Sequence, residues 1–339
     1  MRRSGWVRGL LSGAAVALLA LPAPAAAYRS VAGDRRSRLA PLAVAQHPGA
    51  ERFSLDYEQS CRAFRADVES ARQRGFPVES GEILVPSKMF GDNALSIPWA
   101  LYAPRQGRTE SQSVLVKISG VHGRNEGAAG AALEAATVAG LETLEQAQFA
   151  LLNIHAYNAF GYRTGRRVAE GGEDCLRNCR LEGDDLFAMK NQGYDDLRGA
   201  LEPPGEVRNP RLEGVRVAAG ILGSLFRTPN LKANIAAQQQ AIAGGQFRWR
   251  KGMFFGGQEP VPQLEGVRRV VTELTALFKM RIFADLHTGF GPARGLQVIT
   301  EDEVSEREAA ALVGSVPADS GILLASDPRA GESASRRAL

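Results

Sequence analysis

The spacing of apolar residues along the chain predicts alternating helices and strands. Residues 54–75 have apolar positions at helical spacing and end in glycine, which predicts a helix. Residues 94–104 and 113–120 are apolar, partly β-branched and bounded by Pro and Gly, as in strands. A helix is predicted for the alanine- and leucine-rich residues 128–144, and a buried strand for residues 149–157. This order favours a parallel α/β sheet that is covered on both faces.

The second half of the chain is less regular between residues 174 and 262, where Gly, Pro and Asn are frequent. A helix is predicted within it at residues 230–245, and an amphipathic helix follows at residues 264–280. That helix leads into a strand that runs to Asp285 and His287. The whole pattern predicts one α/β domain over residues 51–326, in three α/β/α layers around a mixed, largely parallel sheet.

The first 27 residues have the layout of a secretory signal peptide. Three arginines and no acidic residue precede the short apolar run LLSGAAVALLALP, and small residues in an A-x-A pattern place cleavage after Ala27. A retained membrane anchor is the alternative, but the run is short for a span. We expect a secreted or periplasmic protein without stable membrane insertion. We also expect residues 28–50 to be a flexible lead-in and residues 327–339 to be a disordered tail.

Composition narrows the class of protein only a little. The 339 residues are 44% hydrophobic and 23% charged, which is typical of a globular domain. Without the three leader arginines, 38 Lys and Arg face 37 acidic residues, so the net charge falls from +4 to about +1. This balance does not favour nucleic acid as a partner. The chain has three cysteines. The spacing of Cys175 and Cys179, with no second pair, favours a disulfide or two free thiols over a zinc knuckle.

Two histidines occupy similar positions in the predicted fold. His122 follows a strand in the stretch SGVHGRNEG, with Glu126 four residues later, and His287 follows another strand. One histidine at a strand end is more often structural, but open α/β sheets bind ligands at the carboxyl ends of their strands. Two histidines with one glutamate are a standard ligand set for catalytic zinc. We therefore expect a Zn²⁺ site at His122, Glu126 and His287, with Asp285 placed to help position that region.

Four stretches together resemble the zinc carboxypeptidase-like superfamily, most closely a bacterial branch catalogued as a domain of unknown function. They are SGVHGRNEG, IHAYNAFGYRTGRRVAEGGEDCLRNC, AIAGGQFRWRKGMFFGG and ADLHTGFGP. The resemblance runs from about residue 54 to about residue 300. It implies the three-layer fold, a zinc ion and the hydrolysis of amide bonds.

The resemblance also implies roles for arginines that bind the substrate carboxylate and the scissile carbonyl. The upstream arginine of the family matches Arg166 or Arg167, and the motif arginine matches Arg177, with Asn178 beside it among the substrate-binding residues. Arginine suits both tasks, because its planar guanidinium pairs with a carboxylate through two hydrogen bonds and keeps its charge.

The sequence departs from the family pattern at three places. The family spacing is H-x-x-E, so Asn125 stands at the glutamate position and Glu126 would need a one-residue bulge to reach a metal. Leu176 replaces an asparagine of the substrate site. Ala325 stands where the family has its general-base glutamate. That residue lies in a predicted strand at 320–326, which follows a predicted helix at 305–314.

These features predict a zinc-dependent hydrolase of amide bonds in peptides or acyl-amino acids, with a free carboxylate near the scissile bond. The departures favour one alternative of a different class, a catalytically impaired homologue that binds carboxylates or peptides. A C-terminally truncated chain is the third possibility, because the tail after residue 326 shows no pattern.

Overall fold

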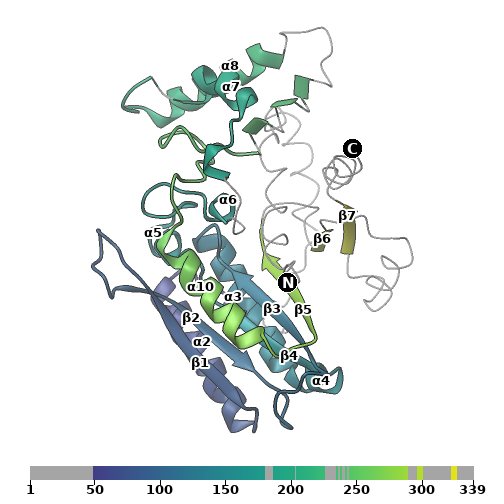
Figure 1. Cartoon of the computed structure of the whole chain (residues 1–339). Coiled ribbons are helices and arrows are strands. Elements are labelled where there is room, and N and C mark those ends of the chain that lie inside the picture. The colour runs from purple at the N-terminus through teal and green to yellow at the C-terminus, as the bar shows by residue number, and fades with distance from the viewer. Residues whose placement is uncertain are drawn as a thin grey trace, which may run out of the picture.

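The computed structural model describes residues 49–179, 186–202, 204–225 and 244–288, short helical pieces between 234 and 242, and two later strands. Five strands form one sheet in the order β1-β2-β4-β3-β5 (Figure 1). The strands are β1 (Val78–Val85), β2 (Leu95–Tyr102), β3 (Ser113–Ser119), β4 (Phe149–Ile154) and β5 (Met280–Leu286). The sequence pattern predicts all of them except β1.

The sheet is mixed, as predicted, but it is less parallel than expected. β3 pairs in parallel with both β4 and β5, whereas β1 with β2 and β2 with β4 are antiparallel. A short connection joins β1 to β2, and a short connection cannot carry the chain back for parallel pairing. Because β3, β4 and β5 run the same way, their carboxyl ends share one edge of the sheet.

Helices cover both faces of this sheet (Figure 1). On one face lie α2 (Tyr57–Gln73) and α3 (Arg124–Ala139), which contact each other, and on the other lies α10 (Pro262–Thr275). The predicted helix at 54–75 matches α2 closely, whereas the one predicted at 264–280 corresponds to α10 but continues past its end to the first residue of β5. The other helices are α4 (Leu141–Gln146), α5 (Ala159–Thr164), α6 (Cys175–Asn178), α7 (Gln192–Leu201) and α8 (Pro210–Leu225), with short 3-10 turns at Ala50–Arg52 and Leu186–Ala188.

Two glycines let α3 approach its neighbours closely. A Cβ on Gly130 would lie 2.3 Å from the Ser119 Cβ at the end of β3, and one on Gly127 would lie 2.3 Å from the Tyr162 ring of α5. Real Cβ atoms do not come that close. The position of α3 against the sheet therefore depends on small residues, and α3 is the helix that carries Glu126.

Several predicted segments fall at the limits of the described residues. The predicted strand at 320–326 corresponds to β7 (Ile322–Ser326), which pairs in parallel with β6 (Leu296–Thr300) in a separate two-stranded sheet. The predicted signal peptide, most of the lead-in, the helix at 305–314 and the tail lie outside the described residues, and the helix at 230–245 is described only in pieces. Within the described part of the chain, no helix is long and apolar enough to cross a membrane.

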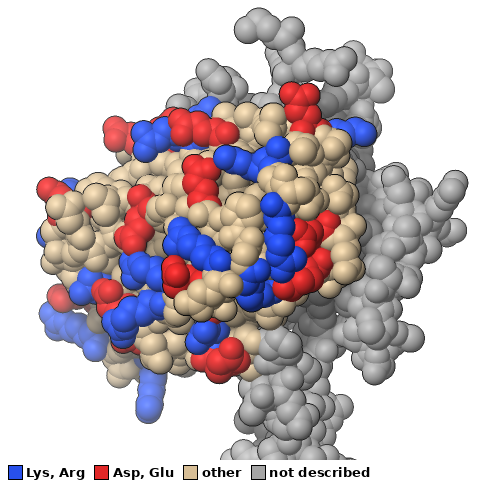
Figure 2. Space-filling view, turned by 90° about the horizontal axis from the view of Figure 1, so that it is seen from below, with Lys and Arg blue, Asp and Glu red and all other residues tan. Residues whose placement is uncertain are grey.

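Charged side chains of both signs are interspersed over the face shown in Figure 2. Many charges of the described residues are paired across partly exposed contacts, such as Arg105 with Glu145 at 2.6 Å and Arg65 with Glu82 at 2.6 Å. Exposed pairs of this kind contribute little to stability, about 0–1 kcal/mol each. Their main effect is a surface without a large field of one sign on that face.

We expect Gly130→Ala to lower the free energy of unfolding by about 1–3 kcal/mol, because the added methyl group must displace Ser119 or α3. Gly214→Ala is the matched control, since Gly214 lies in α8 with nothing within 4 Å of the added Cβ. That control should be neutral or stabilising by up to about 1 kcal/mol. Urea unfolding of both variants measures the difference, and equal stabilities would contradict the close packing of α3.

Candidate metal centre

A tight turn at the end of β3 presents His122. Gly120 and Gly123 both have positive φ, +72° and +78°, and the Gly123 amide donates a hydrogen bond to the Gly120 carbonyl at 3.0 Å. A Cβ on Gly123 would lie 2.2 Å from the Arg166 carbonyl oxygen. Only glycine combines this backbone conformation with that lack of space. The turn thereby joins β3 to α3 with His122 between the two glycines.

The first turn of α3 presents Glu126 to His122. The helix begins at Arg124, earlier than the sequence pattern predicts, so Glu126 is already helical. Asn125 is exposed, whereas Glu126 is only 4% exposed and accepts a hydrogen bond from the His122 backbone N–H at 2.9 Å. Glu126 therefore reaches the centre without an inserted residue, and Asn125 faces away.

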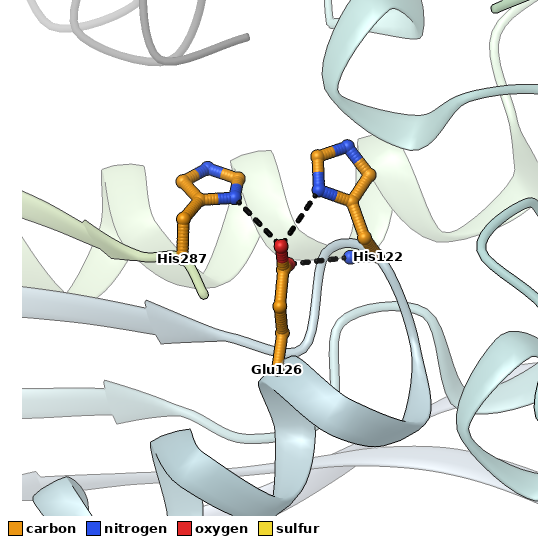
Figure 3. Close-up of side chains that lie close together, drawn as sticks. All are labelled: His122, Glu126 and His287. Carbon is orange, nitrogen blue, oxygen red and sulfur yellow. Dashed lines mark hydrogen bonds and ion pairs between the residues drawn. The ribbon is translucent and has the colours of Figure 1, made fainter. Parts of the chain in front are cut away.

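The parallel pairing of β3 with β5 brings His287 to the same place, because both strands end at one edge of the sheet. The Glu126 carboxylate oxygen Oε1 lies 3.0 Å from Nδ1 of His122 and 3.2 Å from Nδ1 of His287 (Figure 3). One ligand atom from each of the three residues lies within 4.8 Å of the others. The three predicted zinc ligands thus form one cluster, although 161 positions of sequence separate Glu126 from His287.

The electrostatics of this cluster favour charged groups despite burial. Burial raises the pKa of Glu126, but hydrogen bonds to both histidines outweigh it and hold the pKa well below its ordinary value. Burial lowers the pKa of His287, but hydrogen bonds to Asp285 and Glu126 outweigh it and raise the pKa to about 10. A metal ion would compete with these protons, because imidazole binds a metal only through a deprotonated nitrogen.

Two further carboxylates lie behind the histidine rings. Nε2 of His287 is 2.6 Å from Oδ2 of Asp285, and Nε2 of His122 is 3.3 Å from Oδ1 of Asp174. Such outer carboxylates fix the tautomer and orientation of metal-binding histidines. The sequence singles out Asp285 but gives Asp174 no role; its one local signal is that it caps α6, where it accepts from the Leu176 and Arg177 amides.

The structure places the predicted arginines differently from one another. Arg177 is buried, pairs with Asp174, and lies over the Phe254 ring at 4.4 Å from its centroid. The Arg167 side chain is 41% exposed, and its Nη2 lies 2.9 Å from Nε2 of His122. Arg166 is exposed and lies over the Phe160 ring instead. Arg167 is therefore the upstream arginine that reaches the centre.

The position of Asn178 corrects its predicted part in substrate binding. Asn178 is fully buried, its amide donates to the Gly256 and Glu259 carbonyls at 2.7 and 2.9 Å, and its oxygen accepts from the Val261 amide at 2.7 Å. These bonds occupy its polar atoms, so Asn178 anchors the loop before α10 rather than facing a ligand. Leu176 is buried in the core as well.

All three cysteines are free thiols buried in the protein, so Cys175 and Cys179 are not joined. Cys179 donates to the Cys175 carbonyl oxygen at 3.3 Å, and Gln263 lies 3.5 Å from the Cys175 sulfur. Burial is the main reason that the pKa of Cys179 rises to about 12, so this thiol stays protonated. The sequence left a disulfide and two free thiols as alternatives for these residues, and the structure has two free, buried thiols, which are typically inert.

The donor set fits a tetrahedral zinc ion. Ligand atoms about 2.1 Å from such an ion lie about 3.4 Å from one another. The separations between Glu126 and the two histidines, 3.0 and 3.2 Å, are close to that value, and the ligand atoms of the two histidines lie within 4.8 Å of each other. Three protein ligands also leave one position for water or substrate, as in catalytic rather than structural zinc sites.

We expect Asp174→Ala to lower the free energy of unfolding by about 3–5 kcal/mol, because it breaks a buried ion pair with Arg177 and removes the cap of α6. Glu82→Ala is the control, because it breaks the pair with Arg65, whose two side chains are 36% and 49% exposed. That change should cost no more than about 1 kcal/mol. Urea unfolding decides: similar losses for both variants would show that the Asp174 pair is not an internal anchor.

Comparisons with known proteins identify the family. The family model described as "Protein of unknown function (DUF2817)" matches residues 53–320. No curated protein matches the chain. Among solved structures, the esterase LipW from Mycobacterium marinum shares 12% sequence identity, with 69% of this chain and 84% of that chain covered at a TM-score of 0.20. So low a score carries no conclusion about fold or activity. Because the family model spans most of the sequence, the chain belongs to the DUF2817 family.

Proposed function

We propose that the protein is an exported, zinc-dependent hydrolase that cleaves amide bonds in peptides or acyl-amino acids with a free carboxylate near the scissile bond. The observation that supports the proposal is the cluster of the buried His122 and Glu126 with the partly buried His287, with Arg167 beside it. The export part of the proposal rests only on the signal-like residues 1–27.

In this proposal His122, Glu126 and His287 hold the metal, and each histidine has a carboxylate behind it. With Nδ1 turned to the metal, Nε2 carries the proton, so His122 donates to Asp174 and His287 donates to Asp285. Zinc, when bound, supplies a Lewis acid that polarises a carbonyl and lowers the pKa of water.

Arg167 and Arg177 have different roles in this proposal. Nε2 of His122 can either donate to Asp174 or accept from Arg167. When Nε2 carries the proton it donates to Asp174, and the Arg167 guanidinium is then available to bind a ligand. Its partial exposure lets Arg167 meet a substrate carboxylate through two hydrogen bonds. Arg177 is buried and holds Asp174, so it supports the orientation of His122 from behind.

A non-catalytic carboxylate- or peptide-binding protein is the second candidate. Two observations favour it: Leu176 lies in the core where the zinc carboxypeptidase-like pattern has a polar substrate contact, and Ala325 has no proton-accepting group where that pattern has its base. Loss of a positioned acid–base group lowers a rate by about 10²–10⁴. Binding through Arg167 does not depend on that group.

Purified protein should contain about one zinc ion per chain, because three ligands converge on one point. A His122→Ala, His287→Ala double variant and Glu126→Ala should each lose the zinc, whereas Asn125→Ala and His47→Ala should keep it. Elemental analysis after dialysis measures the content. If Glu126→Ala keeps its zinc and Asn125→Ala loses it, the metal ligand is Asn125, at the H-x-x-E spacing of the zinc carboxypeptidase-like pattern, and not Glu126. A cooperatively melting parent that takes up no zinc would leave only the binding candidate.

Arg167→Ala should weaken binding of peptides with a free C-terminal carboxylate by about 10- to 100-fold, through loss of hydrogen bonds to a charged group. The same peptides with an amidated C-terminus should bind equally to parent and variant. Arg166→Ala is the matched control and should change either affinity by less than about twofold. Turnover of the panel that disappears in His287→Ala identifies an enzyme; binding without turnover identifies the second candidate.

A further inference from the structure

A second cluster of buried polar side chains lies away from the candidate metal centre, between the sheet and the helices α2 and α3. It surrounds a cavity of about 10 Å³. The polar residues of its lining are Arg52, Ser60, Asp67, Tyr102, Glu134, Asn153 and His155. None of them is a candidate metal ligand or a candidate substrate-binding arginine.

Three of these residues form a chain that resembles the nucleophile, base and acid of acyl-transfer enzymes. Nε2 of His155 lies 3.1 Å from the Ser60 hydroxyl, and Nδ1 lies 2.7 Å from Oε2 of Glu134. All three side chains are almost fully buried, and a cavity of about 10 Å³ admits no substrate. Burial lowers the pKa of His155, but the Glu134 charge and hydrogen bonds to Cys61 and Glu134 together outweigh it and raise the pKa to about 10. A ring that is protonated at neutral pH cannot take the serine proton.

Four polar atoms around the cavity have no hydrogen-bond partner among the described residues. They are the Tyr102 hydroxyl, Oε1 of Glu134, and both Oδ1 and Nδ2 of Asn153. Each belongs to a side chain that is at most 2% exposed. Buried polar atoms without partners destabilise a fold, and native proteins pair them with protein groups or with ordered water.

We propose that this cavity is a binding site for one internal water molecule, held by Tyr102, Glu134 and Asn153 as a permanent part of the fold. The donors and acceptors match: water accepts from the Tyr102 hydroxyl and the Asn153 amide, and it donates to Oε1 of Glu134 and Oδ1 of Asn153. Four polar partners are the upper end of the usual range of about two to four for a buried water.

Size and charge select water over other ligands. A space of about 10 Å³ for water-sized centres is at the lower limit for one water molecule. A cation is not needed, because Glu134 already faces the charged ring of His155, and Asp67 already pairs with Arg52 at 2.6 Å. A cation would also face the donor hydrogens of Asn153. A neutral ligand that both donates and accepts meets every group present.

The water would link β2, β4 and α3 from one side of that helix. On the same helix, the Leu133 carbonyl and the Thr137 hydroxyl contact the buried Lys117 amine of β3. Glu134 lies eight residues after Glu126, which is about 12 Å along the axis of a helix. The water site therefore helps to fix how α3 is rotated against the sheet, whatever reaction the protein performs.

The sign of a stability change tests the proposal. If water accepts from the Tyr102 hydroxyl, Tyr102→Phe removes a hydrogen bond and raises the unfolding equilibrium constant about 2- to 10-fold. If the cavity is dry, the same variant removes an unpaired hydroxyl and lowers that constant. Tyr57→Phe calibrates the comparison, because the Tyr57 hydroxyl donates to the Ser96 carbonyl at 2.6 Å and its loss must destabilise. Urea unfolding of the full chain measures both variants.

A crystal structure of the full chain at about 1.5 Å resolution tests the site directly and does not depend on any variant. Density about 2.7–3.2 Å from the Tyr102, Glu134 and Asn153 atoms supports the proposal. An empty cavity, or contacts of about 2.3–2.6 Å that mark a cation, would overturn it. In a separate labelling experiment, reaction of Ser60 with a fluorophosphonate would also overturn it, because it would show a site open to substrate.

Discussion

Two histidines from distant parts of the chain meet on one buried carboxylate, that of Glu126. Burying a carboxylate costs several kcal/mol unless charges and hydrogen bonds compensate it. The His122 backbone N–H and two imidazole rings supply that compensation, so three elements must arrive together: the turn after β3, the first turn of α3, and the end of β5. A fold that misplaced any of them would leave the charge of Glu126 without its partners.

Long and regular segments were the predictable part of this fold. α2 and α10 have apolar faces at helical spacing, and β2 to β5 are short apolar runs with clear boundaries. Since parallel strands end at one edge, the positions of His122 and His287 just after strands sufficed to predict that they would meet. β1 escaped prediction because its middle, ESGE, is polar and, at the edge of the sheet, only Ile83 and Val85 of its residues are buried.

Choices between adjacent residues were not predictable, because they depend on where a helix begins and which way a loop turns. Glu126 rather than Asn125 faces His122 because α3 begins at Arg124, after a glycine in a conformation that no spacing rule reveals. Arg167 rather than Arg166 reaches the centre by the course of one loop. Asp174 contacts His122, which lies 52 positions away in the sequence, so the residues around Asp174 do not reveal that contact.

The carboxylates that the described residues bring to the centre are all engaged with histidines. Glu126 meets both rings on the ligand side, whereas Asp174 and Asp285 bond the opposite nitrogens, so a ring separates each of them from the metal position. Oδ1 of Asp285 has no hydrogen-bond partner among the residues that the structure describes, yet it lies behind His287 and cannot take a proton from a nucleophile on the ligand side. A fast hydrolase on this centre therefore requires a proton acceptor from another part of the chain. Without one, the carboxylate contact proposed for Arg167 would remain, because it does not depend on proton transfer. In the proposal, a positioned acid–base group thus separates a hydrolase from a binding protein, and the contact of Arg167 with a carboxylate would be common to both.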